Sequence, residues 1–215
     1  MEFDGPTHAD PTQVHRDATK NRLCEYFGLP LLRINARYLP KKYRDMDLLT
    51  WFVDAWFHSK AFYEAQDSGA IPQDEPFDPH FLWKADSAKS FPMWLTRDIN
   101  TSLRDLHKRR RIRFPGASHV IGKDSSGTFH AIAFIEIDSA SGVVRETAMR
   151  SQSFPIDPTD ILDDIAVYEA YEELVAVLDH GTPPTPLDEI FSMVKTFREH
   201  YEVLISGSIG AGPGQ

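Results

Sequence analysis

The spacing of apolar residues along the chain changes near Pro115-Gly116, from a helical period to a strand period. Before this point apolar residues recur mostly every three or four positions, the spacing of an amphipathic helix. After it, three segments have the shorter period of strands, and loops rich in aspartate, serine and glycine separate them. Two further helical segments close the chain. We therefore expect an α+β protein.

The first 35 residues predict a strand, a helix and a second strand. Met1–Asp4 is a short strand candidate. A helix is expected from about Thr12 to Phe27, because Gly28 is a stop signal. Leu31–Ile34 is short and apolar, which indicates a buried strand. A crossover of this kind makes the two strands parallel.

The next segment predicts a helix over Asp47–Ser68, followed by a linker over residues 70–92 that is rich in proline and acidic residues. Aromatic residues within the linker suggest that part of it is pinned to a surface. They are Phe77, Phe81 and Trp83. The apolar residues at helical spacing are Leu48, Leu49, Phe52, Val53, Trp56, Phe57 and Phe62.

The second half predicts a helix over Met93–Arg111, then an antiparallel three-stranded meander and two more helices. The expected strands are Ser118–Lys123, Thr128–Ile137 and Val143–Arg150. The first closing helix starts at Asp157-Pro158 and has a stripe of Ile161, Ile165, Tyr168, Tyr171, Val175 and Leu178; the second uses Leu187, Ile190, Phe191, Val194, Phe197, Tyr201 and Leu204. We thus divide the chain into residues 1–45, a helix 46–69, the linker 70–92, an α+β domain 93–205 and a disordered tail 206–215.

Composition narrows the class of protein. The single cysteine, Cys24, excludes an internal disulfide and a zinc site built on cysteines, and it fits a reducing cytoplasm. No apolar run reaches the roughly 18 residues of a membrane span, so no membrane partner is expected. The net charge is −9, which argues against bulk affinity for nucleic acid. Residues 81–122 are nevertheless basic and can contact phosphates locally or pair with acidic segments.

The most chemically informative segment is Glu2-Phe3-Asp4-Gly5 with His8 just beyond it. Glu2 and Asp4 are two apart on a predicted strand and so share a side. A hard cation such as Mg²⁺ relieves the repulsion between two carboxylates, polarises a phosphodiester and acidifies a water molecule. His8 can then act as a general base or support the metal ligands from outside the coordination sphere. The alternatives are an ordinary exposed Glu-x-Asp pair and a solvated loop histidine.

The same segment resembles the restriction-endonuclease-like superfamily, PD-(D/E)XK, and within it the very-short-patch-repair enzymes and related endonuclease-like domains. The matching residues are Glu2-Phe3-Asp4-Gly5, His8, Asp17-Ala18-Thr19-Lys20 and Gly28-Leu29-Pro30-Leu31-Leu32-Arg33-Ile34. The resemblance implies an α-β-β-β-α-β core that cleaves DNA with Mg²⁺. It implies that Glu2 and Asp4 hold the metal, that His8 and Lys20 act in catalysis, and that Lys20 and Arg33 lie near the phosphate path.

The chain departs from this pattern in two ways. Residues 1–35 match only the C-terminal half of the core, because the family has an earlier helix, two strands and a further acidic ligand. Glu2-Phe3-Asp4 also lacks the usual lysine at its third position. We therefore expect a catalytically inactive or very weak endonuclease fragment, from a longer gene or a truncated remnant. Alternatively, strands from the C-terminal half complete the sheet, because two strands alone are marginal.

A basic stripe is the strongest surface feature of the rest of the chain. Arg97, Arg104, Lys108 and Arg111 fall opposite the apolar stripe of the Met93–Arg111 helix. They can lie on a DNA backbone, or they can be a solvated helix end that the macrodipole favours. The alternative function is accordingly a non-catalytic α+β module that binds DNA or a protein partner.

Four further residues have structural interpretations. His119 and His130 lie on different predicted strands and can face each other, although core or edge positions are the simpler interpretation. Glu136 and Asp138 repeat the Glu-x-Asp spacing, but we interpret them as a turn and its flank.

Overall fold

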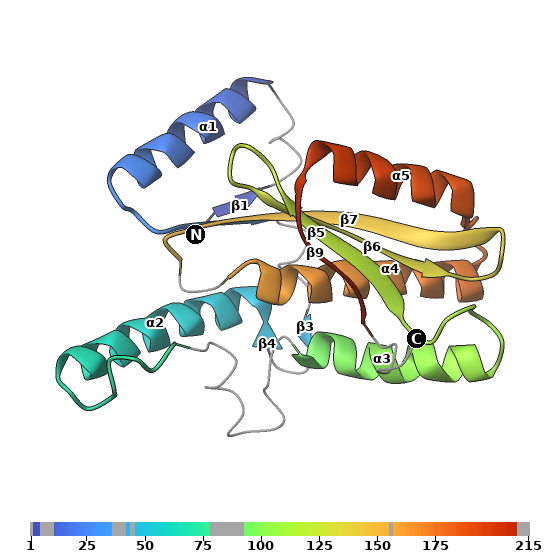
Figure 1. Cartoon of the computed structure of the whole chain (residues 1–215), viewed down its shortest axis with the longest axis horizontal. Helices are drawn as coiled ribbons and strands as arrows, with labels where there is room; N and C mark the ends of the chain where they lie inside the picture. Colours follow the sequence, from blue (N-terminus) through green and yellow to red (C-terminus); the bar gives the residue numbers. More distant parts are fainter. Residues whose placement is uncertain are drawn as a thin grey trace. The chain divides into compact units, whose positions relative to one another are not determined.

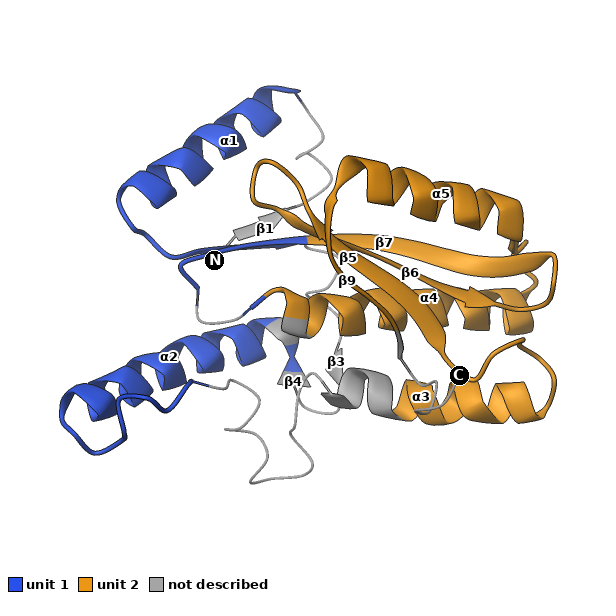
Figure 2. Ribbon diagram, in the orientation of Figure 1, with its two compact units in different colours: residues 1–91, 149–157 blue, residues 92–148, 158–215 orange. Residues whose placement is uncertain are grey.

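The computed structural model describes residues 2–4, 11–35, 42–43, 46–77, 93–154 and 157–209 (Figure 1). The chain has the α+β fold expected from its sequence. It divides into two compact units, residues 1–91 with 149–157 and residues 92–148 with 158–215 (Figure 2). Unit 1 is therefore built from two separate stretches of the chain. Strand β7 (Ser141–Gln152) runs from unit 2 into unit 1.

The strands of unit 1 form the predicted parallel pair and a third strand completes it. β1 (Glu2–Asp4) lies parallel to β2 (Leu31–Asn35), and α1 (Pro11–Tyr26) connects them. On its other side, β2 pairs antiparallel with the end of β7, with Leu31 opposite Gln152 and Ile34 opposite Met149. A strand from the C-terminal half thus completes this sheet, as one of the sequence alternatives proposed.

Buried side chains hold unit 1 together around β2 and α2. Leu31, Leu32 and Ile34 are buried, which confirms the predicted core strand. Helix α2 (Leu48–Asp67) starts at Asp47, whose carboxylate accepts a hydrogen bond from the backbone nitrogen of Thr50 at 2.7 Å. Its buried face carries Trp51, Phe52 and Ala55, whereas Leu49, Val53 and Phe57 of the predicted stripe are exposed.

The start of the predicted linker packs against α2. The side-chain amide of Gln66 donates to the carbonyl oxygens of Pro72 and Glu75, both at 2.8 Å. The ring of Phe77 lies 5.5 Å from that of Phe62, so this aromatic residue is pinned as expected. Phe81 and Trp83 lie outside the described residues. Unit 1 also contains a short antiparallel pair, β3 (Lys42–Tyr43) and β4 (Met46–Asp47).

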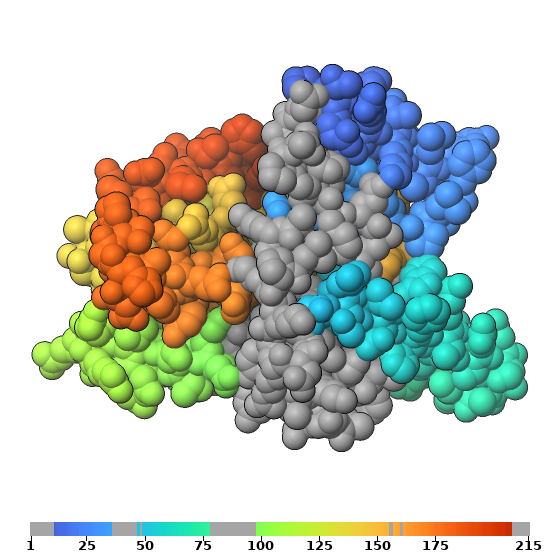
Figure 3. Space-filling view, turned by 180° about the vertical axis from the view of Figure 1, so that it is seen from behind, coloured from blue at the N-terminus to red at the C-terminus, as the bar shows by residue number. Residues whose placement is uncertain are grey.

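Helix α1 lies at the surface (blue in Figure 3). None of its described side chains is buried, and Val14, Leu23 and Tyr26 are exposed. The helix is therefore held to unit 1 by specific polar contacts rather than by a buried apolar stripe.

Unit 2 is a sheet with helices on both faces. The strands run in the order β7, β6 (Phe129–Glu136), β5 (Ala117–Lys123), β9 (Glu202–Ile209), and the short β8 (Thr185–Pro186) pairs with β7. The three strands predicted as a meander are present with their hairpin loops. Helix α4 (Thr159–His180) covers one face and α5 (Leu187–His200) the other, and α3 (Met93–Lys108) packs on α4 (Figure 1).

Helix α4 is buried around more of its circumference than its predicted stripe indicates. Ile161 and Ile165 of that stripe are buried, but the remaining four residues are only partly so. The buried apolar positions outside the stripe are Leu162, Ala166, Val167, Ala170 and Leu174. A helix between a sheet and a second helix needs apolar residues on both sides, which explains the correction. Even so, none of the described helices is long and apolar enough to cross a membrane.

The C-terminal segment is the main correction to the predicted elements. The last helix ends at His200, and residues 202–209, predicted as helix and disordered tail, form β9. β9 pairs antiparallel with β5, so this sheet is larger than the predicted meander. The run Val203-Leu204-Ile205 fits a helix or a strand. It forms a strand because the backbone of β5 offers it hydrogen-bond partners. Residues 210–215 lie outside the described part of the chain.

Candidate functional site

The predicted metal ligands lie on β1, next to the buried strand β2. The Cα partners are Glu2 with Arg33 and Asp4 with Asn35. Glu2 and Asp4 are two apart on this strand and so belong to one face of it. Their side chains are outside the described part of the structure, as is the whole of His8. A metal at this position therefore stays a prediction.

A nearly buried ion pair fastens α1 over β2. The side chain of Arg33 is only 6% exposed, and its guanidinium lies 3.1 Å from the Asp17 carboxylate of α1. Gln13 donates a second hydrogen bond to the same oxygen at 3.0 Å. Solvent screens such a pair much less than a surface pair. Lys20, one turn after Asp17, has an exposed side chain.

Strand β7 brings two more polar residues to this sheet. Arg150 is the Cα partner of Arg33 across β2 and β7, and it is more than nine-tenths buried. Its guanidinium donates to the side-chain oxygen of Gln152 at 3.1 and 3.3 Å. The amide of Gln152 in turn donates to the backbone oxygen of Asn21 in α1 at 3.3 Å. Positions 2, 33 and 150 therefore form one row across three strands.

Arg150 and Gln152 are not recognisable as site residues from the sequence. Both come from a distant part of the chain, and no local motif connects them to β1 or β2. The available signal was a charged residue, Arg150, at the end of a predicted apolar strand. A buried arginine is uncommon unless it is paired or hydrogen-bonded.

The predicted basic stripe lies in unit 2. Ile99 and Leu103 of α3 are buried, while Arg104 and Lys108 are exposed, as the helical period predicted. Lys108 contacts Asp105 at 3.3 Å on the same helix. The helix ends at Lys108, so Arg111 belongs to the following turn and not to the helix. Arg97 is within α3, but its side chain is outside the described set.

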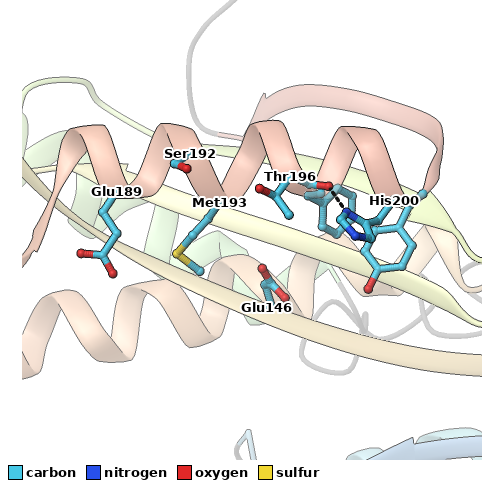
Figure 4. Close-up of a pocket in the computed structure, with 8 residues that line it drawn as sticks. Glu146, Glu189, Ser192, Met193, Thr196 and His200 are labelled. Atoms are coloured by element: carbon cyan, nitrogen blue, oxygen red, sulfur yellow. Dashed lines mark hydrogen bonds between the residues drawn. The ribbon is translucent and has the colours of Figure 1, made fainter.

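A groove of about 330 Å³ lies between α5 and the sheet of unit 2 (Figure 4). Glu146 from β7 and Glu189 from α5 both point into it. Burial raises the pKa of the Tyr201 hydroxyl, and the negative charges of Glu146 and Asp124 raise it further. The described lining contains no lysine or arginine and consists of Glu146, Glu189, Ser192, Met193, Thr196, Phe197, His200 and Tyr201. The carboxylates of Glu146 and Glu189 repel phosphate, so this lining does not favour a nucleic acid.

The two histidines of the meander do not face each other. In the β5–β6 register His119 pairs with Ala133 and His130 with Gly122, so their side chains emerge on opposite faces of the sheet. His130 contacts the Asp124 carboxylate at 3.1 Å. Among the residues that the structure describes, no cluster of three histidine, cysteine, aspartate or glutamate side chains can hold a metal.

His119 lies against α4, with its ring nitrogen Nε2 4.0 Å from the carboxylate of Asp163. Burial lowers the pKa of His119, and the charge of Asp163 opposes that shift. Burial likewise raises the pKa of Asp163 against the effect of His119. Burial thus pushes both groups towards their neutral forms inside unit 2.

Glu136 and Asp138 have the structural roles that the sequence suggested. Glu136 pairs with Arg113 at 2.7 Å. Asp138 accepts hydrogen bonds from the backbone nitrogens of Ala140 and Ser141, both at 2.8 Å, and so closes the hairpin loop.

Comparisons with protein-family models, with curated proteins and with solved structures gave no match to this chain.

Proposed function

We propose that this chain is a DNA-binding protein of the restriction-endonuclease-like type, in which Glu2 and Asp4 hold a Mg²⁺ ion. The observation that carries the proposal is the parallel pairing of β1 with β2 under a helix fastened by Arg33 and Asp17. This is the strand–helix–strand arrangement in which the resembling domains place their metal ligands.

The chemistry follows from the residue types. Carboxylate oxygens are the ligands that Mg²⁺ prefers, and the bound ion polarises a phosphodiester and acidifies a water molecule. His8 is the proposed general base, and the exposed Lys20 supplies positive charge to the phosphate. Arg33 is buried against Asp17, so in this proposal it acts by positioning α1. Two carboxylates are a minimal ligand set, and we expect any cleavage to be weak.

The cytoplasm is the proposed location. Cys24 is a free thiol, and a chain with a single cysteine is compatible with a reducing compartment.

Metal-dependent DNA binding tests the proposal. Fluorescence anisotropy with a labelled duplex is measured in Mg²⁺, in Ca²⁺ and in EDTA, alongside nicking of supercoiled plasmid. We expect both ions to strengthen duplex binding. Glu2→Gln or Asp4→Asn should reduce this metal-dependent gain in affinity at least about tenfold, as is usual when metal coordination is disturbed. Glu25→Gln, which removes an exposed carboxylate of α1, is the matched control and should leave the gain unchanged.

The result in EDTA separates this proposal from its alternative. If duplex binding is equally strong in EDTA and insensitive to Glu2→Gln and Asp4→Asn, the metal site is wrong and a non-catalytic DNA-binding module is the better description. If the chain binds no duplex under any of these conditions, the remaining alternative is a module that binds a protein partner.

A further inference from the structure

Helix α3 of unit 2 is followed directly by three consecutive exposed arginines, Arg109, Arg110 and Arg111, which we call the arginine turn. The backbone nitrogen of Arg110 donates to His107 at 2.8 Å, and that of Arg111 donates to Leu106 at 2.9 Å. These two hydrogen bonds form the Schellman motif that closes many helices. The motif requires a left-handed residue, and here that residue is Arg110, with φ at +58°.

Glycine occupies the equivalent left-handed position after three other helices of the chain. Gly28, Gly69 and Gly181 follow α1, α2 and α4 with φ of +62°, +78° and +72°. A side chain in this conformation brings Cβ too close to the following carbonyl oxygen, which is why glycine is favoured. An arginine at a backbone position that favours glycine suggests a use for its side chain.

The turn is anchored on both sides. Ile112, which follows it directly, is 3% exposed, and its carbonyl oxygen lies 3.3 Å from the ring of His107. Arg113 is held to Glu136 of β6 by a backbone hydrogen bond of 2.9 Å and by the side-chain ion pair. The three arginines are therefore presented from a backbone that loses little freedom when a ligand binds.

The basic side chains in and around the turn differ in whether a carboxylate lies against them. Lys108 contacts Asp105, and Arg113 contacts Glu136. Arg109, Arg110 and Arg111 have no carboxylate partner among the described residues. Guanidinium groups bind phosphate oxygens in a bidentate manner, so three of them in a row favour a polyanion of closely spaced phosphates.

We propose that the arginine turn binds the phosphate backbone of double-stranded DNA. Duplex DNA carries about one negative charge per 1.7 Å of helix axis, a denser row of phosphates than a single strand offers to three neighbouring guanidinium groups. Within unit 2, the groove beside α5 is lined by Glu146 and Glu189, so the arginine turn is the more favourable place for a phosphate. The interaction needs neither Glu2 nor Asp4 and stands apart from the proposed metal site.

The salt dependence of duplex binding, measured by anisotropy in EDTA, tests this proposal. Each phosphate contact adds about 0.9 to the slope of log K against log salt concentration. Changing Arg109, Arg110 and Arg111 together to glutamine should therefore lower the slope by about two to three. Lys195→Gln removes an exposed cation on α5 and is the matched control, with no expected change.

Arg110→Gly separates loss of contact from loss of fold. Glycine adopts the left-handed conformation more easily, so this variant should melt at a higher temperature while its salt slope falls by about one. Absence of duplex binding by the unmodified chain in EDTA, or an unchanged slope in the triple variant, would overturn the proposal. So would arginine-dependent binding to phosphatidylserine vesicles without binding to the duplex. EDTA removes any metal contribution, so failure here is distinct from failure of the metal site.

Discussion

At the scale of single residues, Arg110 has the clearest energetic consequence. Its left-handed conformation costs about 1–2 kcal/mol relative to the usual region, while glycine introduces an entropy cost of about 0.5–1 kcal/mol. We predict that Arg110→Gly raises the free energy of unfolding by up to about 1 kcal/mol, measured by urea denaturation. Gly28→Ala is the converse control, because a Cβ at Gly28 meets no atom within 4 Å and only the backbone strain is added. A destabilised Arg110→Gly variant would contradict the strain argument.

The buried His119 predicts how stability depends on pH. Burial lowers the folded-state pKa of His119 below its ordinary value of 6.5. The contribution of the neutral histidine to the free energy of unfolding is therefore fully present above pH 6.5 and is lost as pH falls below it. Asp163 acts in the opposite sense, because its raised pKa favours the folded state at low pH. We predict that His119→Asn flattens the decline in unfolding free energy as pH falls from about 7 towards 5. An unchanged decline in this variant would show that another group titrates there.

At the scale of elements, the boundaries of helices and strands could be predicted where a turn-forming residue coincides with a clear change in the spacing of apolar residues. Gly28 ends α1, and the loop from Asp124 to Gly127 separates β5 from β6, as expected. The segment after α5 shows the limit of that logic. Tyr201 and Leu204 continue the helical spacing, and the alternative strand gains its hydrogen bonds only from β5, about eighty residues earlier in the chain.

Gly122 on β5 determines whether β9 and the end of α5 can approach that strand. A Cβ added at Gly122 would lie 2.7 Å from the Cβ of Tyr201 and 3.2 Å from the backbone oxygen of Glu202. We predict that Gly122→Ala destabilises the protein by about 1–3 kcal/mol in urea denaturation and speeds hydrogen exchange in β9. Ser125→Ala, in the exposed loop of the same hairpin, should have little effect. Normal stability of Gly122→Ala would mean that β9 does not pack on β5 in this register.

At the scale of the whole molecule, one part of the candidate site could be predicted from the sequence and another part could not. Glu2, Asp4, Asp17 and Arg33 lie within one strand–helix–strand unit, so their proximity follows from local order. Arg150 joins them through strand pairing over more than a hundred residues. No residue pattern near Arg150 specifies β2 as its neighbour, because that pairing depends on how both stretches of unit 1 fold together.

The charge distribution also becomes interpretable only in the folded chain. The sequence shows a basic segment within an acidic whole. In unit 2 the carboxylates of Glu146 and Glu189 line the groove beside α5, whereas the arginine turn follows α3. Contacts with DNA are therefore expected to be local and strongly sensitive to salt.

Direct detection of a bound metal ion tests whether Glu2 and Asp4 are metal ligands. Mn²⁺ substitutes for Mg²⁺ at oxygen-rich sites, and its electron paramagnetic resonance signal distinguishes free from bound ion. We predict a bound population of Mn²⁺ in the unmodified chain and in Glu25→Gln, and its loss in Glu2→Gln and in Asp4→Asn. Equal Mn²⁺ binding by all four proteins, or no binding by the unmodified chain, would contradict the assignment of Glu2 and Asp4 as metal ligands.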